Sequence, residues 1–574
     1  LSLVLVFTNF LVNAQELFAP AGTSVSTSTV VFEYAIGDII VGSVDNSNFQ
    51  ITQGFSQPRS SSVFYSHNNT NLNSTNNWWS NDDGTGTHPS DFTNPDYEFI
   101  IQTGDTYTAN ANWTVAGDVT ILGVLITGNN VITVAGKSDI NGTLAISNNG
   151  VYDADGQFDA SNGAIDQDGT SVLRVSDSVT SIGTLDALAG TVEYDGENYG
   201  TWQYILGDTY YNLKTSQPGL KKTAGNITVE NELEVYHQLI IDDGFEVDVL
   251  NNCTIHDSLG LSNNSQLDVG GILDATSSGW FGTVPNHTNP IIIVRDSVTS
   301  FSNSTFGFKT DGDLKVIYRG QNNLSQTIVS DLLSNPNGSG YLLELDNNSG
   351  FNLYEKLNVK GINFSNGIIN TNNDTIFVND SREILNYSES SYVNGNIATY
   401  LYPNSSNLND PPGVVTFPIG DANNYRPISL DFQSSTINYL SKYTQVNFTN
   451  SSIYSSSFSG AITRVAKYYW KISDPSSSPS TKIKFDFDNS YGIDDLSSLT
   501  IVGYDGNNWV EIPSTVTGTV TNGTIETTNA VTDFSNYYFT LASTNSNTNL
   551  LGNPVPKTYV PDDNFEAYLE THDA

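Results

Sequence analysis

The chain has 574 residues, of which 21 are Lys or Arg and 61 are Asp or Glu, so its formal net charge is −40. It has no basic patch to neutralise phosphates, which argues against nucleic acid as a partner. Hydrophobic residues make up 37% and aromatic residues 11%, a composition that argues against disorder, and the length indicates several domains.

The first residues, LSLVLVFTNFLVNAQ, have the apolar core and small-residue cleavage site of a secretory signal, with cleavage expected after Ala14. A first buried strand is the alternative interpretation. The sequence contains no Met, so we expect the true start to lie upstream and the chain to be a fragment. No other segment approaches the ~20 apolar residues of a membrane helix, so no transmembrane span is expected. The single Cys253 is expected to be a small core residue.

The middle of the chain consists of short apolar alternations that are broken by Gly, Asn and Asp, which is typical of many short strands. It also contains an internal repeat. LAISNNGVYDADGQFDASNG at 144–163 matches LGLSNNSQLDVGGILDATSSG at 259–279, and DSVTS occurs at both 177–181 and 296–300. A long repeat of short strands predicts a parallel β-solenoid built from two degenerate copies. Two tandem β-sandwiches are the main alternative.

The following segment has longer alternating strands, which favour an antiparallel β-sandwich. These strands are YTQVNFT (443–449), AKYYWKIS (466–473), TKIKFDFD (481–488), LTIVGYDGNNWVEI (499–512) and NYYFTLAS (536–543). The predicted fold class is therefore all-β, a solenoid followed by a sandwich. The expected segments are a signal peptide (1–14), an N-terminal β segment (15–58), a Trp-bearing cap (59–97), the β-solenoid (98–398), the β-sandwich (399–543), a linker (544–556) and the start of a truncated further module (557–574).

Three stretches resemble large secreted and cell-surface proteins of Bacteroidetes. VFEYAIGDIIVGSVDNSNFQITQGFSQP at 31–58 is similar to the segment that follows the signal in such proteins, and Tyr468-Tyr469-Trp470 matches the YYW motif of their sandwich module. TYVPDDNFEAYLE at 558–570 resembles the lead-in to their leucine-rich repeats. The resemblance implies an adhesin-like architecture, export by the type IX system and a place outside the cell or on its surface.

No catalytic, cofactor-binding or metal-binding residue is assigned, because the motifs GxxxxGK, HExxH, GxSxG and CxxC are all absent. The densest carboxylate group is interpreted as solvated turn residues, with structural calcium as the lesser alternative. Arg174 and Arg295 recur near DSVTS and are interpreted as structural residues of the coils. The carboxylates of this group are Asp153, Asp155, Asp159, Asp166 and Asp168, and the histidines, at 67, 88, 237, 256, 287 and 572, are scattered along the chain.

Five tryptophans are candidates for stacking on sugar rings: Trp78, Trp79, Trp113, Trp202 and Trp280. The adjacent pair Trp78-Trp79 is the best candidate, and a cap over the first coil is its structural alternative. Arg426 is expected to bond a carboxylate or carbonyls across the boundary between solenoid and sandwich.

Together these observations predict a secreted or cell-surface structural, adhesin-like protein without catalytic activity. The alternative is an extracellular polysaccharide-binding protein, or a polysaccharide lyase or hydrolase on a β-solenoid. The expected partners are extracellular polysaccharide or another cell surface. The oligomeric state is left open.

Overall fold

The structure is a computed structural model. It describes residues 23–26, 31–34, 44–46, 49–51, 62–68, 71–186, 188–197, 201–275, 280–284, 288–299, 314–321, 324–328, 341–402, 413–433, 443–450, 456–473, 480–532, 534, 538–549 and 551. The expected signal peptide at 1–14 and the expected start of a further module at 557–574 lie outside the described residues.

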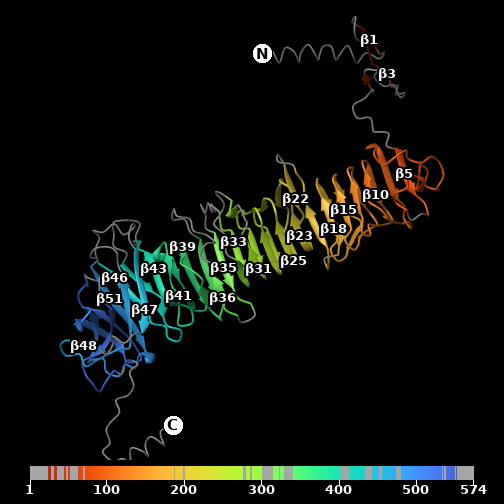
Figure 1. Ribbon diagram of the computed structural model, residues 1–574. Coiled ribbons are helices and arrows are strands. Elements are labelled where there is room, and N and C mark those ends of the chain that lie inside the picture. Colours follow the sequence, from red (N-terminus) through yellow and green to blue (C-terminus); the bar gives the residue numbers. More distant parts are fainter. Residues whose placement is uncertain are drawn as a thin grey trace, which may run out of the picture.

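The chain is all-β, with a parallel β-solenoid of about 13 turns followed by antiparallel sheets, as predicted. Figure 1 shows an elongated body that runs from β5 (Ser62–Ser66) at one end to β48 (Ser457–Phe458) at the other. Successive coils pair in parallel, for example with Val119 opposite Ser138. Parallel pairing requires a crossover between the paired strands, so tandem antiparallel sandwiches are excluded for this region.

The first coils have three strands each, and two of their faces form short parallel sheets. Sheet A consists of β5 (Ser62–Ser66), β7 (Tyr97–Ile101), β10 (Asp118–Ile121), β13 (Ser138–Ile140), β16 (Phe158–Asp159) and β19 (Val179–Ser181). Sheet B consists of β8 (Thr106–Thr108), β11 (Val124–Ile126), β14 (Thr143–Ile146), β17 (Ala164–Gln167) and β20 (Thr184–Leu185).

The third face, sheet C, runs the length of the solenoid. Its strands are β9 (Trp113–Val115), β12 (Val131–Val134), β15 (Val151–Ala154), β18 (Val172–Val175), β21 (Thr191–Tyr194), β23 (Thr209–Thr215), β25 (Ile227–Val235), β27 (Glu246–Val249), β28 (Asn252–Ile255), β30 (Gln266–Val269), β31 (Ile272–Asp274), β33 (Ile291–Val294), β34 (Ser297–Thr299), β35 (Lys315–Arg319), β37 (Leu342–Asp346), β40 (Gly361–Asn366) and β42 (Ile384–Leu385).

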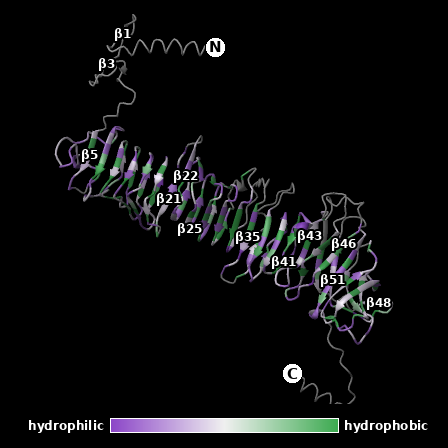
Figure 2. Cartoon of the chain, turned by 180° about the vertical axis from the view of Figure 1, so that it is seen from behind, coloured by the Kyte–Doolittle hydropathy of each residue, from purple (hydrophilic) through white to green (hydrophobic). Residues whose placement is uncertain are grey.

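The core of the solenoid follows from the period of two along each strand. Val119, Ile121 and Leu125 point inward and are fully buried, while their neighbours face outward. Figure 2 shows hydrophobic and hydrophilic residues interleaved along the length of the body. At one corner a Cβ on Gly142 would lie 2.1 Å from the carbonyl oxygen of Gly123 in the preceding coil, so only glycine fits there. Cys253 is buried in β28, as expected.

The solenoid changes its faces at two places. Sheets A and B end at β19 and β20, and sheet D begins at β22 (Trp202–Ile205), continuing through β24 (Leu220–Thr223), β26 (Leu239–Ile241), β29 (Ser258–Leu261) and β32 (Trp280–Thr283). After β32, a further sheet, sheet E, begins at β36 (Gln326–Ile328). The two changes are called the first and second junctions, and sheet C runs through both.

The N-terminal end of the solenoid is covered by an aromatic cluster. The 3-10 helix η1 (Thr75–Asn77) leads into β6 (Trp78–Trp79), which pairs with β5. Trp78 is fully buried and stacks on Trp113 of the first coil, with ring centroids 5.8 Å apart. This packing is that of a cap, the structural alternative for the Trp78-Trp79 pair.

Sheet E passes directly from the solenoid into the sandwich. β43 (Val393–Tyr400) pairs in parallel with the solenoid strand β41 (Ile369–Val378) and in antiparallel with β47 (Tyr443–Asn450). The expected boundary after residue 398 therefore falls within a strand that both parts share. Further strands of this sheet are β38 (Phe351–Leu353), β39 (Leu357–Val359), β41 (Ile369–Val378), β45 (Ile419–Gly420), β47 (Tyr443–Asn450), β48 (Ser457–Phe458), β49 (Arg464–Val465), β50 (Tyr468–Ser473), β52 (Leu499–Tyr504), β53 (Asn508–Ile512) and β56 (Tyr538–Ser543).

The second layer of the sandwich, sheet F, packs on sheet E around Trp470, whose ring lies 4.4 Å from that of Phe485. Asn549 bonds the backbone of Asp494 and Asp495, so the packed part of the chain extends beyond residue 543. Sheet F consists of β44 (Gly413–Phe417), β46 (Ile428–Phe432), β51 (Thr481–Asp488), β54 (Ser514–Thr519) and β55 (Asn522–Thr527), and two 3-10 helices are η3 (Ser381–Glu383) and η6 (Asn489–Tyr491).

Two antiparallel backbone pairs precede the solenoid, namely β1 (Thr23–Ser26) with β2 (Val31–Tyr34) and β3 (Val44–Asn46) with β4 (Phe49–Ile51). In the described part of the chain, no helix has the length and hydropathy needed to span a bilayer.

Candidate functional site

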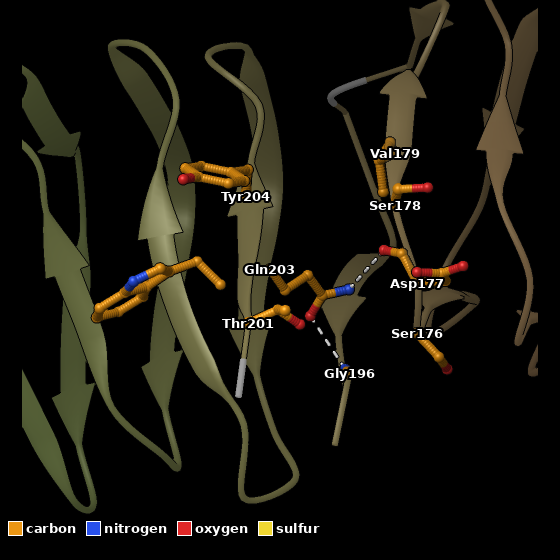
Figure 3. A pocket seen from close by; sticks show the side chains of 9 residues that line it. Ser176, Asp177, Ser178, Val179, Gly196, Thr201, Gln203 and Tyr204 are labelled. Atoms are coloured by element: carbon orange, nitrogen blue, oxygen red, sulfur yellow. Dashed lines mark hydrogen bonds between the residues drawn. The ribbon is translucent and has the colours of Figure 1, made fainter. Parts of the chain in front are cut away.

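A groove lies at the first junction, between the last strand of sheet A and the first strand of sheet D. One wall comes from residues 176–179 and Gly196, and the other from residues 201–204 of β22 and its approach. Its volume is about 150 Å³. Figure 3 shows the two walls facing each other, with the side chain of Gln203 between them.

Gln203 joins the two walls of the groove. Its Nε2 donates to the carbonyl oxygens of Val175 at 2.7 Å and Asp177 at 3.2 Å, and its Oε1 accepts from the amide of Gly196 at 3.0 Å. Sheet A has ended here and sheet D has only begun, so the glutamine amide links the end of one sheet to the start of the other. The carbonyl of Val175 also accepts a hydrogen bond of 3.1 Å from the amide of Asp195.

The outward side chains of β22 are aromatic. Trp202 and Tyr204 alternate with Gln203 and so lie on the outer face of sheet D, with 39% and 51% of their surface exposed. Lys222 on the next strand places its Nζ 5.7 Å from the centre of the Trp202 ring and 2.8 Å from a carboxylate oxygen of Asp242. The groove therefore offers two open aromatic rings beside hydroxyl groups.

A buried lysine lies beneath the groove. The Nζ of Lys221 donates to the carbonyl oxygens of Gly196 at 2.9 Å, Ser216 at 2.6 Å and Gln217 at 3.0 Å. The side chain is fully buried, and burial lowers its pKa to about 8. This ammonium group satisfies carbonyls of the turn between β23 and β24, together with that of Gly196 in one wall of the groove.

A row of alternating charges, the charged ladder, follows sheet C beside the groove. Arg174 lies between Asp153 of the preceding coil at 3.4 Å and Glu193 of the following coil at 3.2 Å, and Glu193 contacts Lys214 at 3.6 Å. The strand register places these four side chains opposite one another. Arg174 therefore has a structural role, which agrees with its interpretation from the sequence.

Asp195 connects the charged ladder to the groove. Its carboxylate lies 3.4 Å from Arg174 and accepts a hydrogen bond of 2.7 Å from the hydroxyl of Ser176, a lining residue. Burial raises the pKa of Asp195 to about 6. Among the carboxylates described for this region, it is therefore the one best suited to exchange a proton near neutral pH.

At the second junction a glutamine also bonds two carbonyls of the preceding coil, an arrangement called the glutamine joint, but the residues beside it differ. The Nε2 of Gln326, at the start of sheet E, donates to the carbonyl oxygens of Val294 at 3.2 Å and Asp296 at 3.1 Å. The residues that flank it are Ser325 and Thr327. The glutamine joint is thus a feature of both copies, whereas the two aromatic side chains belong to the first copy only.

Of the other predicted tryptophans, those with described side chains do not form an open platform. Trp113 is buried with Trp78, and Trp79 lies between His67 and His88, with ring centroids at 6.0 and 5.5 Å. The structure thus brings together two histidines that the sequence leaves far apart. The side chain of Trp280 lies outside the described residues.

The carboxylates considered as calcium ligands each have separate partners in the structure. Asp153 belongs to the charged ladder, Asp159 accepts from the amide of Ser161 at 3.1 Å, and Asp168 accepts from the amide of Asn148. No group of three or more His, Cys, Asp or Glu side chains suited to a metal ion occurs among the residues that the structure describes.

Two further arginines, Arg295 and Arg426, also have structural partners. Arg295 binds both carboxylate oxygens of Asp268, at 2.7 and 2.6 Å. Arg426 is buried, donates to the hydroxyl of Ser490 at 2.6 Å and to its carbonyl at 3.0 Å, and lies 3.9 Å from the ring of Tyr491. The partners of Arg426 therefore belong to the sandwich itself. The expectation that Arg426 bonds groups across the boundary between solenoid and sandwich was wrong.

Sequence reasoning did not single out Gln203, Tyr204 or Lys221. One signal was available in the repeat. EYDG at 193–196 is echoed by IYRG at 317–320, and the likeness can be extended to WQYI at 202–205 and SQTI at 325–328. The shared glutamine marks the joint, and the differing flanks mark what the first copy adds. No protein-family model, curated protein or solved structure matches this chain.

Proposed function

We propose that this chain is a secreted or cell-surface, adhesin-like protein without catalytic activity, in which a long β-solenoid displays binding surfaces. The observation that carries this proposal is the sharing of sheet E by solenoid and sandwich through β43. A sheet that crosses from one part to the other resists bending at that point, because its ladder of backbone hydrogen bonds is continuous. Such a rod holds a binding surface at a fixed distance from its point of attachment.

The distribution of charge supports a binding role over a catalytic one. Arg174 and Arg295 are both engaged with carboxylates of neighbouring coils. One of them lies near DSVTS in each copy, as expected for groups that hold coils together. The acidic character of the chain also favours solubility and opposes aggregation.

The proposed partners are extracellular polysaccharides or another cell surface. Export is supported by the apolar N-terminal stretch and by the resemblance to type IX cargo proteins. The test uses the purified full chain on a panel of soluble polysaccharides, with affinity electrophoresis for retention and assays for new reducing or unsaturated ends. Retention without cleavage is the expected result, and catalytic release of either kind of end would overturn the proposal.

A second candidate is a polysaccharide lyase or hydrolase, and Asp195 is the observation that favours it. A carboxyl group with a pKa of about 6 beside a groove has the property of a general acid or base. This candidate predicts that wild-type protein cleaves a polysaccharide and that Asp195→Asn abolishes cleavage. Retention of the polymer by both proteins without new ends would eliminate it.

A further inference from the structure

We infer that the groove at the first junction binds one ring of a neutral polysaccharide, which stacks on Trp202 and Tyr204. The inference deepens the proposed function, on which it rests, because it names the site and the class of ligand. It concerns nine described residues, those that line the groove between β19 and β22.

The first argument is the exposure of the two rings. Within β22 the inward positions hold Gln203, which makes the joint, and Ile205, which is fully buried. Trp202 and Tyr204 contribute to neither task and leave 39% and 51% of their surface open. Large aromatic groups placed side by side on the outside of a sheet are typical of binding surfaces, since burying them would otherwise stabilise the fold.

The second argument is an internal comparison that the repeat supplies. At the second junction Gln326 bonds two carbonyls in the same way, while the positions of Trp202 and Tyr204 are occupied by Ser325 and Thr327. Small polar side chains therefore suffice for a stable joint. The aromatic pair of the first junction is an addition that the architecture does not require.

The third argument is the chemistry of the lining. A pyranose ring has apolar faces of C–H groups and an edge of hydroxyls, so it needs an aromatic surface with hydrogen-bonding groups at its side. The groove provides both, because Ser178, Thr201 and Asp177 line it together with the rings. Its volume of about 150 Å³ is below the range of about 300–1,000 Å³ for pockets that enclose a small molecule. A single ring of a longer chain fits this scale better than an enclosed ligand.

The fourth argument selects neutral over anionic polymers. Asp177 is the one charged residue among the nine that line the groove, and it is negative. The ammonium groups near the groove are already engaged, that of Lys222 with Asp242 at 2.8 Å and that of Lys221 with backbone carbonyls, including that of Gly196 at 2.9 Å. A chain with a net charge of −40 also repels polyanions at long range. Uronic-acid polymers are therefore disfavoured.

The test uses affinity electrophoresis of the full chain in gels that contain galactomannan, mixed-linkage β-glucan or dextran, with alginate as the anionic comparison. The test variant, Trp202→Ser with Tyr204→Thr, gives the first junction the residues of the second. The matched control is Tyr354→Ala, because Tyr354 is an aromatic residue with 70% exposure elsewhere on the solenoid. Circular dichroism and the unfolding midpoint establish that both variants are folded.

We expect at least one neutral polymer to retard the wild type and the Tyr354→Ala control equally. We expect the double variant to bind that polymer at least about tenfold more weakly, since it loses two stacking surfaces. Alginate is expected to cause no retardation. Equal binding by the double variant, failure of all three neutral polymers, or a preference for alginate would overturn the inference. None of these results involves cleavage, so they are distinct from the failure of the proposed function.

Discussion

The two junctions of the solenoid solve one structural problem with the same residue and surround it differently. In each, a glutamine at the start of a new sheet bonds two carbonyls of the preceding coil, Gln203 at the first and Gln326 at the second. The first junction adds two exposed aromatic rings and a buried lysine beneath them. The comparison separates what a junction needs in order to fold from what one junction has gained.

The largest effect is expected from the buried lysine, which makes the first junction depend on a charge. Lys221→Met removes an ammonium group that donates to at least three backbone carbonyls and leaves them without a partner. We expect a loss of about 3 kcal/mol or more in the free energy of unfolding, measured by chemical denaturation. In β38, which follows the second junction, there is no lysine.

Lys222→Met is the control for this change, since Lys222 is the neighbouring residue and makes a partly exposed ion pair with Asp242. It is expected to cost less than about 1 kcal/mol. Equal midpoints for Lys221→Met and the wild type would show that the carbonyl cluster does not need the ammonium group.

The second effect concerns pH and again belongs to the first junction. The pKa of Asp195 is about 6 in the folded chain, above its usual value, because of burial. As the pH falls from 7 to 4, the folded state takes up this proton before the unfolded state does, so this group stabilises the fold increasingly. The wild type should gain up to about 3 kcal/mol relative to Asp195→Asn over that range.

The measurement is a set of denaturation curves for both proteins at pH 4, 5, 6 and 7, and the quantity compared is the difference between them. Taking the difference cancels the titration of the other carboxylates. A difference that is constant across the range would contradict a raised pKa for Asp195.

The glutamine joint should be worth a similar amount in both copies. Gln203→Ala and Gln326→Ala each remove two donated bonds and one accepted bond, the last from the amide of Gly196 and from the side chain of Asn347 respectively. We expect each to lower the free energy of unfolding by about 2 kcal/mol, because partly buried polar groups lose hydrogen bonds. Gln157→Ala, at an exposed position, should change it by less than about 0.5 kcal/mol. A large loss at only one junction would break the analogy between them.

The smallest effect is expected from the aromatic pair. Trp202→Ser with Tyr204→Thr alters two exposed side chains and should change the free energy of unfolding by no more than about 1 kcal/mol. Thermal unfolding followed by circular dichroism measures this change. A loss of several kcal/mol would mean that the rings hold the first junction together and that Ser325 and Thr327 are not their equivalents.

Much of the architecture could be predicted from local pattern. The five strand runs expected in the sandwich correspond to β47, β50, β51, the β52–β53 hairpin and β56. The cap role of Trp78 was foreseen as an alternative, and the structural role of Arg174 was inferred from its recurrence. These features follow from alternation and repetition, which a chain carries in its own order of residues.

The groove could not be predicted in the same way. Gln203 is separated by 28 residues from Val175, whose carbonyl it bonds, and Lys221 by 25 residues from Gly196. Whether such residues meet depends on the length of each coil and on where a sheet ends. The Trp78-Trp79 pair appeared to be the better sugar platform because adjacency in sequence was visible and burial was not.

The sequence by itself determined the all-β class, the two-copy solenoid and the strands of the sandwich, because period-two alternation and a long repeat act within each strand and each copy. Only the tertiary structure decided which aromatic rings stay open, that β43 belongs to two parts of the molecule, and that one glutamine closes each junction. These depend on stacking: a residue's surroundings come from the coils before and after it, about 20 positions away in the chain.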